Sequence, residues 1–160
     1  QLADIVNLTK ALGVEKISFA FPHALGSARD NFESVIPQYS CLKENLNLAC
    51  KIAKNNNINI ELETIPFCIV PNYIEFVGEL YYLKNETVCS PVNKNSYAWN
   101  DIRRSIKKKG KRCSICYFNN ICEGVWDEYY ETFGGDEFIP MQYKNEYDQL
   151  IKSAIDNYNT

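Results

Sequence analysis

The stretch NNNINIELETIPFCIV, residues 55–70, contains the alternation that decides the fold of this chain. Three asparagines mark the end of a helix, and between Ile58 and Glu63 three apolar residues then alternate with three polar ones. Such alternation predicts a β-strand with one buried face. Its polar face allows two interpretations: the strand lines a barrel that holds a ligand in its lumen, or it lies at a sheet edge with one face in water.

The residues before this strand predict the order helix, strand, helix. Residues 38–54 place four apolar side chains on one helical face. Earlier, VEKISFAF at 14–21 alternates like a strand, and residues 2–12 have helical spacing that ends at Gly13. Strands that alternate with helices of this length pair in parallel through crossover helices. Residues 1–72 are therefore expected to be β/α units of an α/β protein.

Composition and charge exclude several classes of protein. The chain has 160 residues, is 46% hydrophobic and 23% charged, and carries a net charge of −3. No apolar run reaches the roughly 18 residues of a transmembrane helix, and no signal-peptide pattern is visible. We therefore expect no membrane partner and a cytoplasmic location. Because Gln1 already lies in a helical pattern, we also expect the chain to be a segment of a longer protein.

Three further parts are expected after residue 72. In residues 73–112 the periodic patterns fade, so this part is expected to be an irregular connector. It ends in RRSIKKKGKR, residues 103–112, where seven of ten residues are basic. Residues 113–141 are expected to form a cysteine-rich and mostly helical segment, and residues 142–160 a terminal helix.

The cysteines predict a metal site. Seven cysteines without a secretory signal argue against a disulfide framework. Cys113 and Cys116 have the spacing Cys-x2-Cys, which turns two thiolates to one side, and Cys122 follows as a third. Thiolates select zinc, copper(I) or iron–sulfur clusters. Zinc and a 4Fe–4S cluster each take four ligands, so either a fourth comes from elsewhere or one position stays open. The best candidate for the fourth is Cys68, just past the predicted strand, and the alternative is Cys89.

The other cysteines and the single histidine are expected to be structural. Cys41 and Cys50 lie within the predicted helix 38–54, where cysteine behaves as a small buried apolar residue. His23 lies in a predicted loop, and with only one histidine in the chain a mixed histidine–cysteine site is not expected.

The basic run allows two interpretations. It could bind the phosphates of a nucleic acid, with Tyr117 and Phe118 available to stack on bases. Alternatively, it could lower the pKa of the neighbouring cysteines and balance the negative charge of a thiolate-bound cluster. Several acidic residues follow closely, which favours charge balance and makes nucleic acid the less favoured partner.

The segment RCSICYFNNICEGVWDEYYETFGGDEFIPM, residues 112–141, resembles the C-terminal, SPASM-like auxiliary segment of radical S-adenosylmethionine proteins. These proteins end in Cys-x2-Cys-x5-Cys-x-Gly, then a tyrosine, then Gly-x-x-Glu-Phe-x-Pro. The matching positions here are Cys113, Cys116, Cys122, Gly124, Tyr129 or Tyr130, Gly134 or Gly135, Glu137, Phe138 and Pro140. Residues 13–31 and 61–70 resemble the later strands of the same family's barrel.

This resemblance implies the C-terminal part of a partial triosephosphate-isomerase-type barrel, followed by an auxiliary 4Fe–4S cluster. The cluster ligands would be Cys68, Cys113, Cys116 and Cys122. Members of the family cleave S-adenosylmethionine reductively, and the adenosyl radical then abstracts hydrogen from a substrate, here a small molecule or a peptide.

The loop PHALGSARDN, residues 22–31, corresponds to the place where such barrels contact S-adenosylmethionine or substrate. Gly26 would let the backbone approach the ligand closely, and Arg29 and Asn31 could bind a carboxylate or a ribose. The open alternative is an ordinary loop in which Asn31 or Asp30 caps a helix.

Two departures from the family pattern limit what this chain alone can do. The catalytic Cys-x3-Cys-x2-Cys motif is absent, so S-adenosylmethionine cleavage would need a missing N-terminal barrel half as partner. The family often has a further cysteine where Trp126 stands here, which strengthens the case for Cys68. A different hypothesis is a non-catalytic module, stapled by zinc or a cluster, that binds a protein or a nucleic acid.

Overall fold

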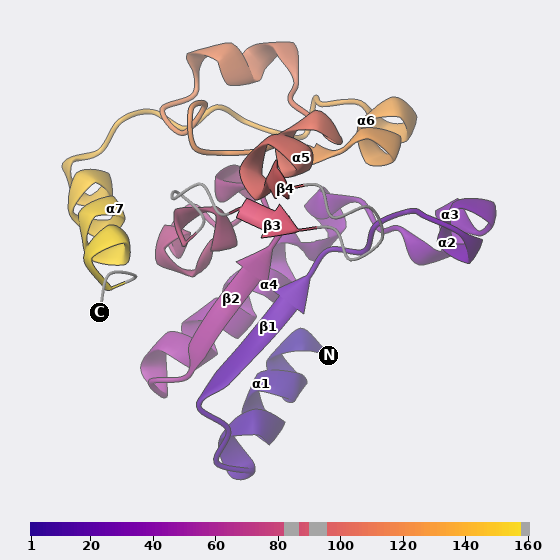
Figure 1. Cartoon of the computed structure of the whole chain (residues 1–160). Helices are drawn as coiled ribbons and strands as arrows, with labels where there is room; N and C mark the ends of the chain where they lie inside the picture. The colour runs from indigo at the N-terminus through magenta and orange to yellow at the C-terminus, as the bar shows by residue number, and fades with distance from the viewer. Residues whose placement is uncertain (82–86, 90–95, 158–160) are drawn as a thin grey trace.

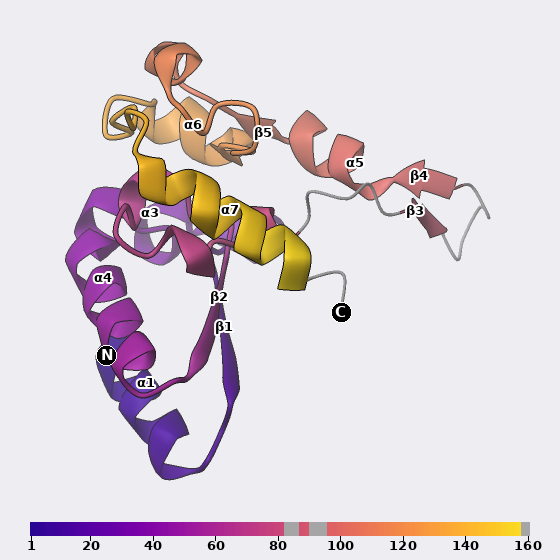
Figure 2. The same cartoon turned by 90° about the vertical axis from the view of Figure 1, so that its left-hand side faces the viewer.

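Two parallel strands, β1 (Lys16–Ala20) and β2 (Asn59–Glu63), form the centre of the N-terminal part of the chain (Figure 1). This computed structural model describes residues 1–81, 87–89 and 96–157. The helices α1 (Leu2–Ala11) and α4 (Tyr39–Asn55) lie against one face of the two strands (Figure 2). The parallel pairing predicted from the alternation of strands and helices is confirmed.

The end of α4 and the start of β2 are set by the asparagine run. Asn57 has a left-handed φ of 55°, which asparagine tolerates better than most residues. The N–H of Ile58 donates to the carbonyl oxygen of Ala53 at 3.0 Å and closes the last turn. The chain then reverses into β2, whose residues Ile60 and Leu62 are fully buried. The predicted helix and strand thus lie where the periodicity placed them.

The polar side of the sheet carries its own side-chain pairs. Lys16 Nζ lies 2.8 Å from Glu61 Oε2, and Ser18 Oγ donates to Glu63 Oε1 at 3.1 Å. Both pairs join neighbouring strands on the face opposite the buried Leu62. The described strands form three separate two-stranded sheets, so the partial barrel stays a prediction.

The connector contains short regular elements rather than only irregular chain. After β2 come the 3₁₀ helices η1 (Phe67–Ile69), η2 (Ile74–Phe76) and η3 (Gly78–Leu80). They are followed by the antiparallel pair β3 (Thr87–Cys89) and β4 (Ser96–Ala98), by α5 (Trp99–Ser105) and by β5 (Lys107–Lys108). These elements are too short for their periodicity to be seen in the sequence. Val77 forms a parallel bridge with Leu62, so a third backbone segment runs beside β2.

The cysteine segment lies over the carboxyl ends of β1 and β2 (Figure 1). It contains η4 (Lys111–Ile115), β6 (Val125–Trp126), which pairs with β5, and α6 (Asp127–Phe133). The predicted short helix ended by glycines is confirmed, because α6 ends at Phe133 and Gly134 is its C-cap. The last helix is α7 (Asn145–Asn157). No helix in the described part of the chain has the length and apolar character needed to cross a membrane.

Contacts between distant parts of the sequence fix the start of α4. Glu137 Oε2 accepts a hydrogen bond from the N–H of Ser40 at 2.6 Å, and the hydroxyl of Tyr129 accepts one from the N–H of Tyr39 at 3.0 Å. Tyr129 in turn donates its hydroxyl proton to Glu137. Exposed N–H groups in the first turn of a helix need such partners. The cysteine segment therefore caps a helix of the N-terminal part.

Candidate metal centre

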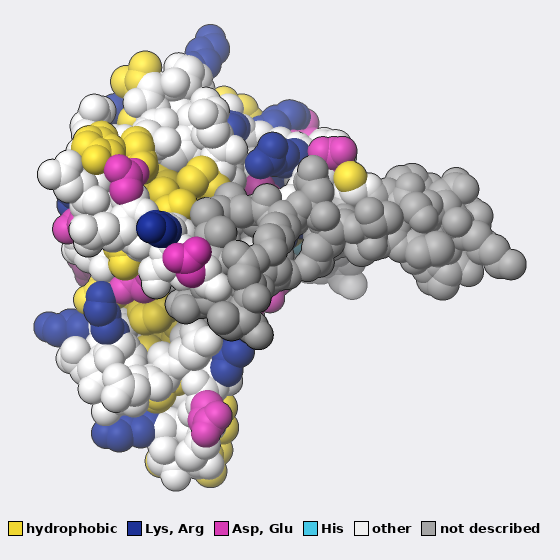
Figure 3. All heavy atoms as spheres, turned by 60° about the vertical axis from the view of Figure 1, so that its left-hand side comes forward, with side chains coloured by type: hydrophobic (Ala, Val, Ile, Leu, Met, Phe, Trp, Pro, Cys, Tyr) yellow, Lys and Arg dark blue, Asp and Glu magenta, His cyan; other side chains and the backbone are white. Residues whose placement is uncertain are grey.

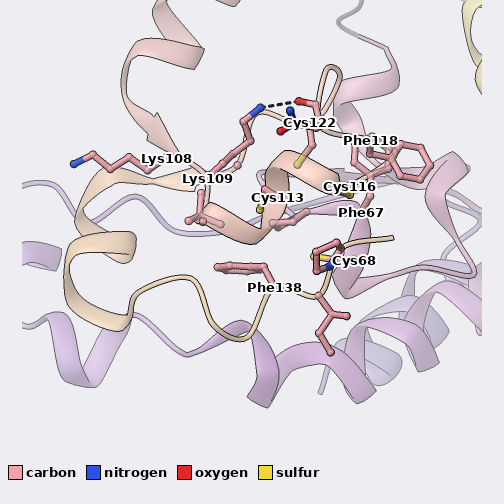
Figure 4. A pocket seen from close by; sticks show the side chains of 16 residues that line it. Phe67, Cys68, Lys108, Lys109, Cys113, Cys116, Phe118, Cys122 and Phe138 are labelled. Atoms are coloured by element: carbon pink, nitrogen blue, oxygen red, sulfur yellow. Dashed lines mark hydrogen bonds between the residues drawn. The ribbon is translucent and has the colours of Figure 1, made fainter. Parts of the chain in front are cut away.

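Four cysteines gather around one pocket beneath the cysteine segment (Figure 4). The lining of the pocket includes Cys68, Cys113, Cys116 and Cys122. Cys68 comes from η1, just beyond β2, and the other three from η4 and the turns after it. The fold thus brings together the four residues that the sequence predicted as ligands.

Tight turns present the three clustered cysteines. The N–H of Cys113 donates to the carbonyl oxygen of Gly110 at 2.9 Å, and the N–H of Cys116 donates to that of Cys113 at 3.0 Å. The N–H of Cys122 donates to the carbonyl oxygen of Phe118 at 2.8 Å. Each turn closes over about three or four residues, which is why the spacing Cys-x2-Cys brings two thiols to one wall.

Aromatic side chains form the apolar walls of the pocket. Phe67 and Phe118 stack with ring centroids 4.4 Å apart, and both are buried. Phe138 and Val125, also buried, line the pocket with them. Such walls exclude water and lower the local dielectric response. A group bound here would be shielded from water on these sides.

Burial raises the pKa of two of the four thiols. The pKa of Cys68 rises to about 12, through burial first and then through the neighbouring Cys116 and Cys113. The pKa of Cys122 also rises, through burial and then through the carboxyl group of Glu79. Both groups are therefore thiols at neutral pH in the free chain. A metal or cluster that binds their thiolates must release protons.

The interpretation that the basic run lowers the pKa of its neighbouring cysteines does not hold for Cys122, whose pKa is raised. Burial dominates, and several of the basic side chains are paired elsewhere. Lys107 Nζ lies 2.7 Å from Glu123 Oε2, and Arg103 Nη2 lies 2.9 Å from the same oxygen. The positive charges of these two side chains are thus paired with a buried carboxylate.

A backbone hydrogen bond reaches one of the cysteine sulfurs. The N–H of Met141 donates to Cys116 Sγ at 3.3 Å, and the N–H of Tyr117 donates to the carbonyl oxygen of Met141 at 2.9 Å. The chain that leaves the cysteine segment therefore returns beside it. Hydrogen bonds to ligand sulfurs are one of the means by which proteins set the potential of an iron–sulfur cluster.

Two kinds of metal group could use the cysteines of this pocket. Among the side chains that the structure describes, no three of the types His, Cys, Asp and Glu converge closely enough to hold one metal ion. A zinc ion needs four ligands at about 2.3 Å from one point. In a 4Fe–4S cluster each of four thiolates binds a different iron. Either group would draw on the four cysteines of this pocket.

The loop residues expected to contact S-adenosylmethionine lie outside this pocket. Gly26 has a φ of 55° and precedes the short helix α2 (Ser27–Asp30). Arg29 Nη2 lies 3.5 Å from Glu128 Oε1, and Asn31 Nδ2 donates to the carbonyl oxygen of Ser27 at 2.9 Å. Both side chains thus have partners within the chain, and their cofactor role stays a prediction.

His23 joins the same loop to the cysteine segment. Its ring stacks on that of Trp126 with centroids 3.9 Å apart, and its Nε2 lies 3.2 Å from Glu128 Oε2. Trp126, which stands where the family often has a further cysteine, therefore packs against the loop. The expectation that His23 is a loop residue is confirmed.

Two of the remaining cysteines differ from each other. Cys50 is fully buried in α4, as expected of a small apolar residue. Cys41, in the first turn of α4, is exposed, so the same expectation was wrong there. Cys89, the alternative fourth ligand, belongs to β3, but its side chain lies outside the described residues.

The sequence analysis missed a buried carboxyl group next to this site. Glu79 is 2% exposed, and neither of its carboxyl oxygens has a hydrogen-bond partner among the described residues. Burial raises its pKa to about 7, although the nearby Lys107 opposes this rise. Nothing in the sequence around residue 79 distinguishes this glutamate from a surface residue.

Ionisation of Glu79 is expected to destabilise the protein above neutral pH. Folding raises the pKa of Glu79 from about 4.3 to about 7, so protonation of its carboxyl group stabilises the folded state. This stabilisation is complete below pH of about 4.3 and is lost as the pH rises through about 7. Glu79→Gln should therefore remove a loss of up to about 3 kcal/mol between about pH 5 and pH 8. Urea unfolding at both pH values measures this. An equal difference between wild type and variant at the two pH values would contradict it.

Gly124 is a position where the fold requires glycine. It has a φ of 91°, and a Cβ atom added there would lie 2.1 Å from the carbonyl oxygen of Lys108. Gly124→Ala should therefore cost about 2 kcal/mol or more of unfolding free energy, because backbone must move. Gly134→Ala is the matched control, since its φ of 73° is similar but its surroundings are open. Equal losses in the two variants would show that the close approach to Lys108 is unimportant.

Comparison with known proteins gives no family for this chain. No model of a known protein family matches the chain, and no curated protein or solved structure is significantly similar to it.

Proposed function

We propose that this chain is the C-terminal portion of a radical S-adenosylmethionine enzyme and binds an auxiliary 4Fe–4S cluster. The observation that carries the proposal is the pocket shared by Cys68, Cys113, Cys116 and Cys122. Three of these residues belong to one motif, but Cys68 comes from a different part of the chain. Four cysteines in one apolar pocket are the ligand set of such a cluster.

Each part of the pocket has a role in this proposal. The four thiolates hold the cluster, which when bound accepts and donates single electrons. Phe67, Phe118 and Phe138 shield it from water. The N–H of Met141 donates to the sulfur of Cys116 and stabilises negative charge there. The carboxyl ends of β1 and β2, which face the cysteine segment, would contribute part of the S-adenosylmethionine and substrate site.

The experiment that tests the proposal is the measurement of iron and sulfide on protein purified or reconstituted without oxygen. We expect about four irons and four sulfides per chain and a broad absorption band near ~400 nm that bleaches on reduction. Cys113→Ala should lower the bound iron sharply. A colourless protein with about one zinc per chain would instead support the zinc-stapled binding module.

A further inference from the structure

A short connection, residues 64–66, joins the end of β2 to η1, the 3₁₀ helix that carries Cys68. The ring of Pro66 fixes its own φ, which is −59°, and confines the preceding Ile65 to extended conformations. Of the residues in this connection, Thr64 is thus left with the widest choice of backbone conformation. The direction in which the chain leaves β2, and with it the place of Cys68, depends on Thr64.

Thr64 has a backbone conformation that threonine rarely adopts. Its φ is 56°, in the left-handed region, where a side chain branched at Cβ is crowded against the backbone. The residue is buried. A disfavoured conformation of this kind persists only where the surrounding structure holds it. Neighbouring groups must therefore hold Thr64 in place.

The hydroxyl of Tyr39 supplies such a hold. It donates to the carbonyl oxygen of Thr64 at 2.7 Å, inside the protein. Tyr39 is fully buried, and burial raises the pKa of its hydroxyl well above the usual value, so the group stays protonated and remains a donor. Loss of this donor would take a partner from a buried carbonyl oxygen, which is unfavourable away from water.

Residues of the cysteine segment hold Tyr39 in turn. Its ring packs against that of Phe138, which lines the cysteine pocket, with centroids 5.5 Å apart. The ring of Tyr129 lies 4.9 Å from it, and the hydroxyl of Tyr129 accepts from the N–H of Tyr39. Tyr39 thus connects two parts of the pocket that are far apart in sequence: the segment 113–141 and the connection that leads to Cys68.

We propose that Tyr39 is a positioning residue for Cys68. Its hydroxyl, by holding the carbonyl oxygen of Thr64, keeps the connection after β2 in the conformation that brings Cys68 to the pocket. The use of the Cys68 thiol as a ligand rests on the proposed cluster, whereas its placement by Tyr39 does not. Without the hydroxyl, we expect Thr64 to spend part of the time in an extended conformation and Cys68 to leave the pocket with it.

The first test measures how fast each cysteine of the full, metal-free chain is alkylated by iodoacetamide, with mass spectrometry of the modified peptides. Tyr39→Phe removes the hydroxyl and keeps the ring. Cys68 should be alkylated more than about tenfold faster in this variant, because the rate follows local opening of the connection. Cys50, which is buried in α4, reports on the whole fold and should keep its rate within about twofold.

A second substitution tests whether the strain at Thr64 is the reason. Glycine adopts a positive φ without strain, so Thr64→Gly should make the hydroxyl of Tyr39 largely dispensable. In the Thr64→Gly background, Tyr39→Phe should therefore change the alkylation rate of Cys68 by less than about threefold. A purely structural contribution of the hydroxyl would give the same change in both backgrounds.

The matched control removes a tyrosine hydroxyl at the surface. Tyr143 is 54% exposed and donates to Asp148 Oδ2 at 2.8 Å. Acidic and basic side chains lie among one another over the surface seen in Figure 3, where water can replace such a contact. Tyr143→Phe should leave the alkylation rate of Cys68 within about twofold of the wild type.

The chain reconstituted with its cluster gives an independent readout. A cluster that loses one of its ligands loses the iron at that position first, which leaves a three-iron cluster with its own electron paramagnetic resonance signal. On mild oxidation, this signal should grow more than about fivefold faster in Tyr39→Phe than in the wild type. Thr64→Gly should again reduce the difference.

Several outcomes would overturn the inference. Equal acceleration at Cys68 and Cys50 would show that Tyr39→Phe only loosens the fold, and an equal effect of Tyr143→Phe would show that the position of the hydroxyl does not matter. An unchanged rate at Cys68, or an effect of Tyr39→Phe that Thr64→Gly does not reduce, would also contradict it. If the wild type holds no iron, the proposed function fails, and the alkylation rates of the metal-free chain still decide this inference.

Discussion

Replacement of Cys68 by alanine is expected to reduce the iron content of the reconstituted chain from about four per chain to less than half of that. In the proposed site Cys68 would supply the one thiolate that comes from outside the segment 113–122, and no other described residue of the pocket wall outside that segment is a cysteine. Without it, one iron would face the pocket with no protein ligand and be lost readily. Iron and sulfide analysis with the spectrum near ~400 nm measures the change.

Two further variants make this result specific. Cys41→Ala removes an exposed cysteine outside the pocket and should keep the full iron content. Cys89→Ala tests the alternative fourth ligand. Full iron in Cys68→Ala together with a large loss in Cys89→Ala would assign the fourth position to Cys89.

Replacement of Glu123 by alanine should destabilise the fold by about 3–5 kcal/mol. Its carboxylate, 4% exposed, accepts from Lys107, whose side chain is fully buried, and from Arg103, whose side chain is 11% exposed. Removal of the carboxylate would leave two largely buried cations with less compensation, beside the ring of Trp126 that already contacts Lys107. Urea unfolding under identical cofactor loading measures the loss as a lower midpoint with an unchanged slope.

The control for this variant is Glu131→Ala. Glu131 also pairs with a lysine of the basic run, since its Oε1 lies 2.8 Å from Lys108 Nζ, but both side chains are largely exposed. Exposed ion pairs contribute less than about 1 kcal/mol. If the two variants lose similar amounts of stability, the buried position of Glu123 does not matter and the prediction is wrong.

The sequence predicted those parts of the fold whose periodicity is long. Helix α4 and strands β1 and β2 follow from apolar spacing, because one face of each must be buried. The hairpin β3–β4 and the pair β5–β6 were not predicted, since strands of two or three residues show no pattern. Their pairing depends on contacts between distant residues that local preference does not reveal.

The residues of the candidate site could be predicted where the spacing of the cysteines indicates a metal site. Cys113, Cys116 and Cys122 share one motif, and Cys68 followed from its place just beyond a strand. The basic run was harder to interpret, because Lys107 and Lys111 look alike in sequence although one is buried and the other exposed. Glu79 could not be found, since its burial results from the packing of the whole segment around it.

The caps that the cysteine segment places on α4 bear on how far this chain can be divided. A boundary at residue 112 would separate Ser40 from Glu137 and Tyr39 from Tyr129, and the first turn of a long helix would lose its partners. An expression fragment that ends before the cysteines should therefore fray at residues 38–42, with faster amide exchange there than in the intact chain. The two parts have different local chemistry, yet we expect these caps to make them unfold as one cooperative unit, and gain or loss of the cysteine segment in evolution would have required a new cap for α4.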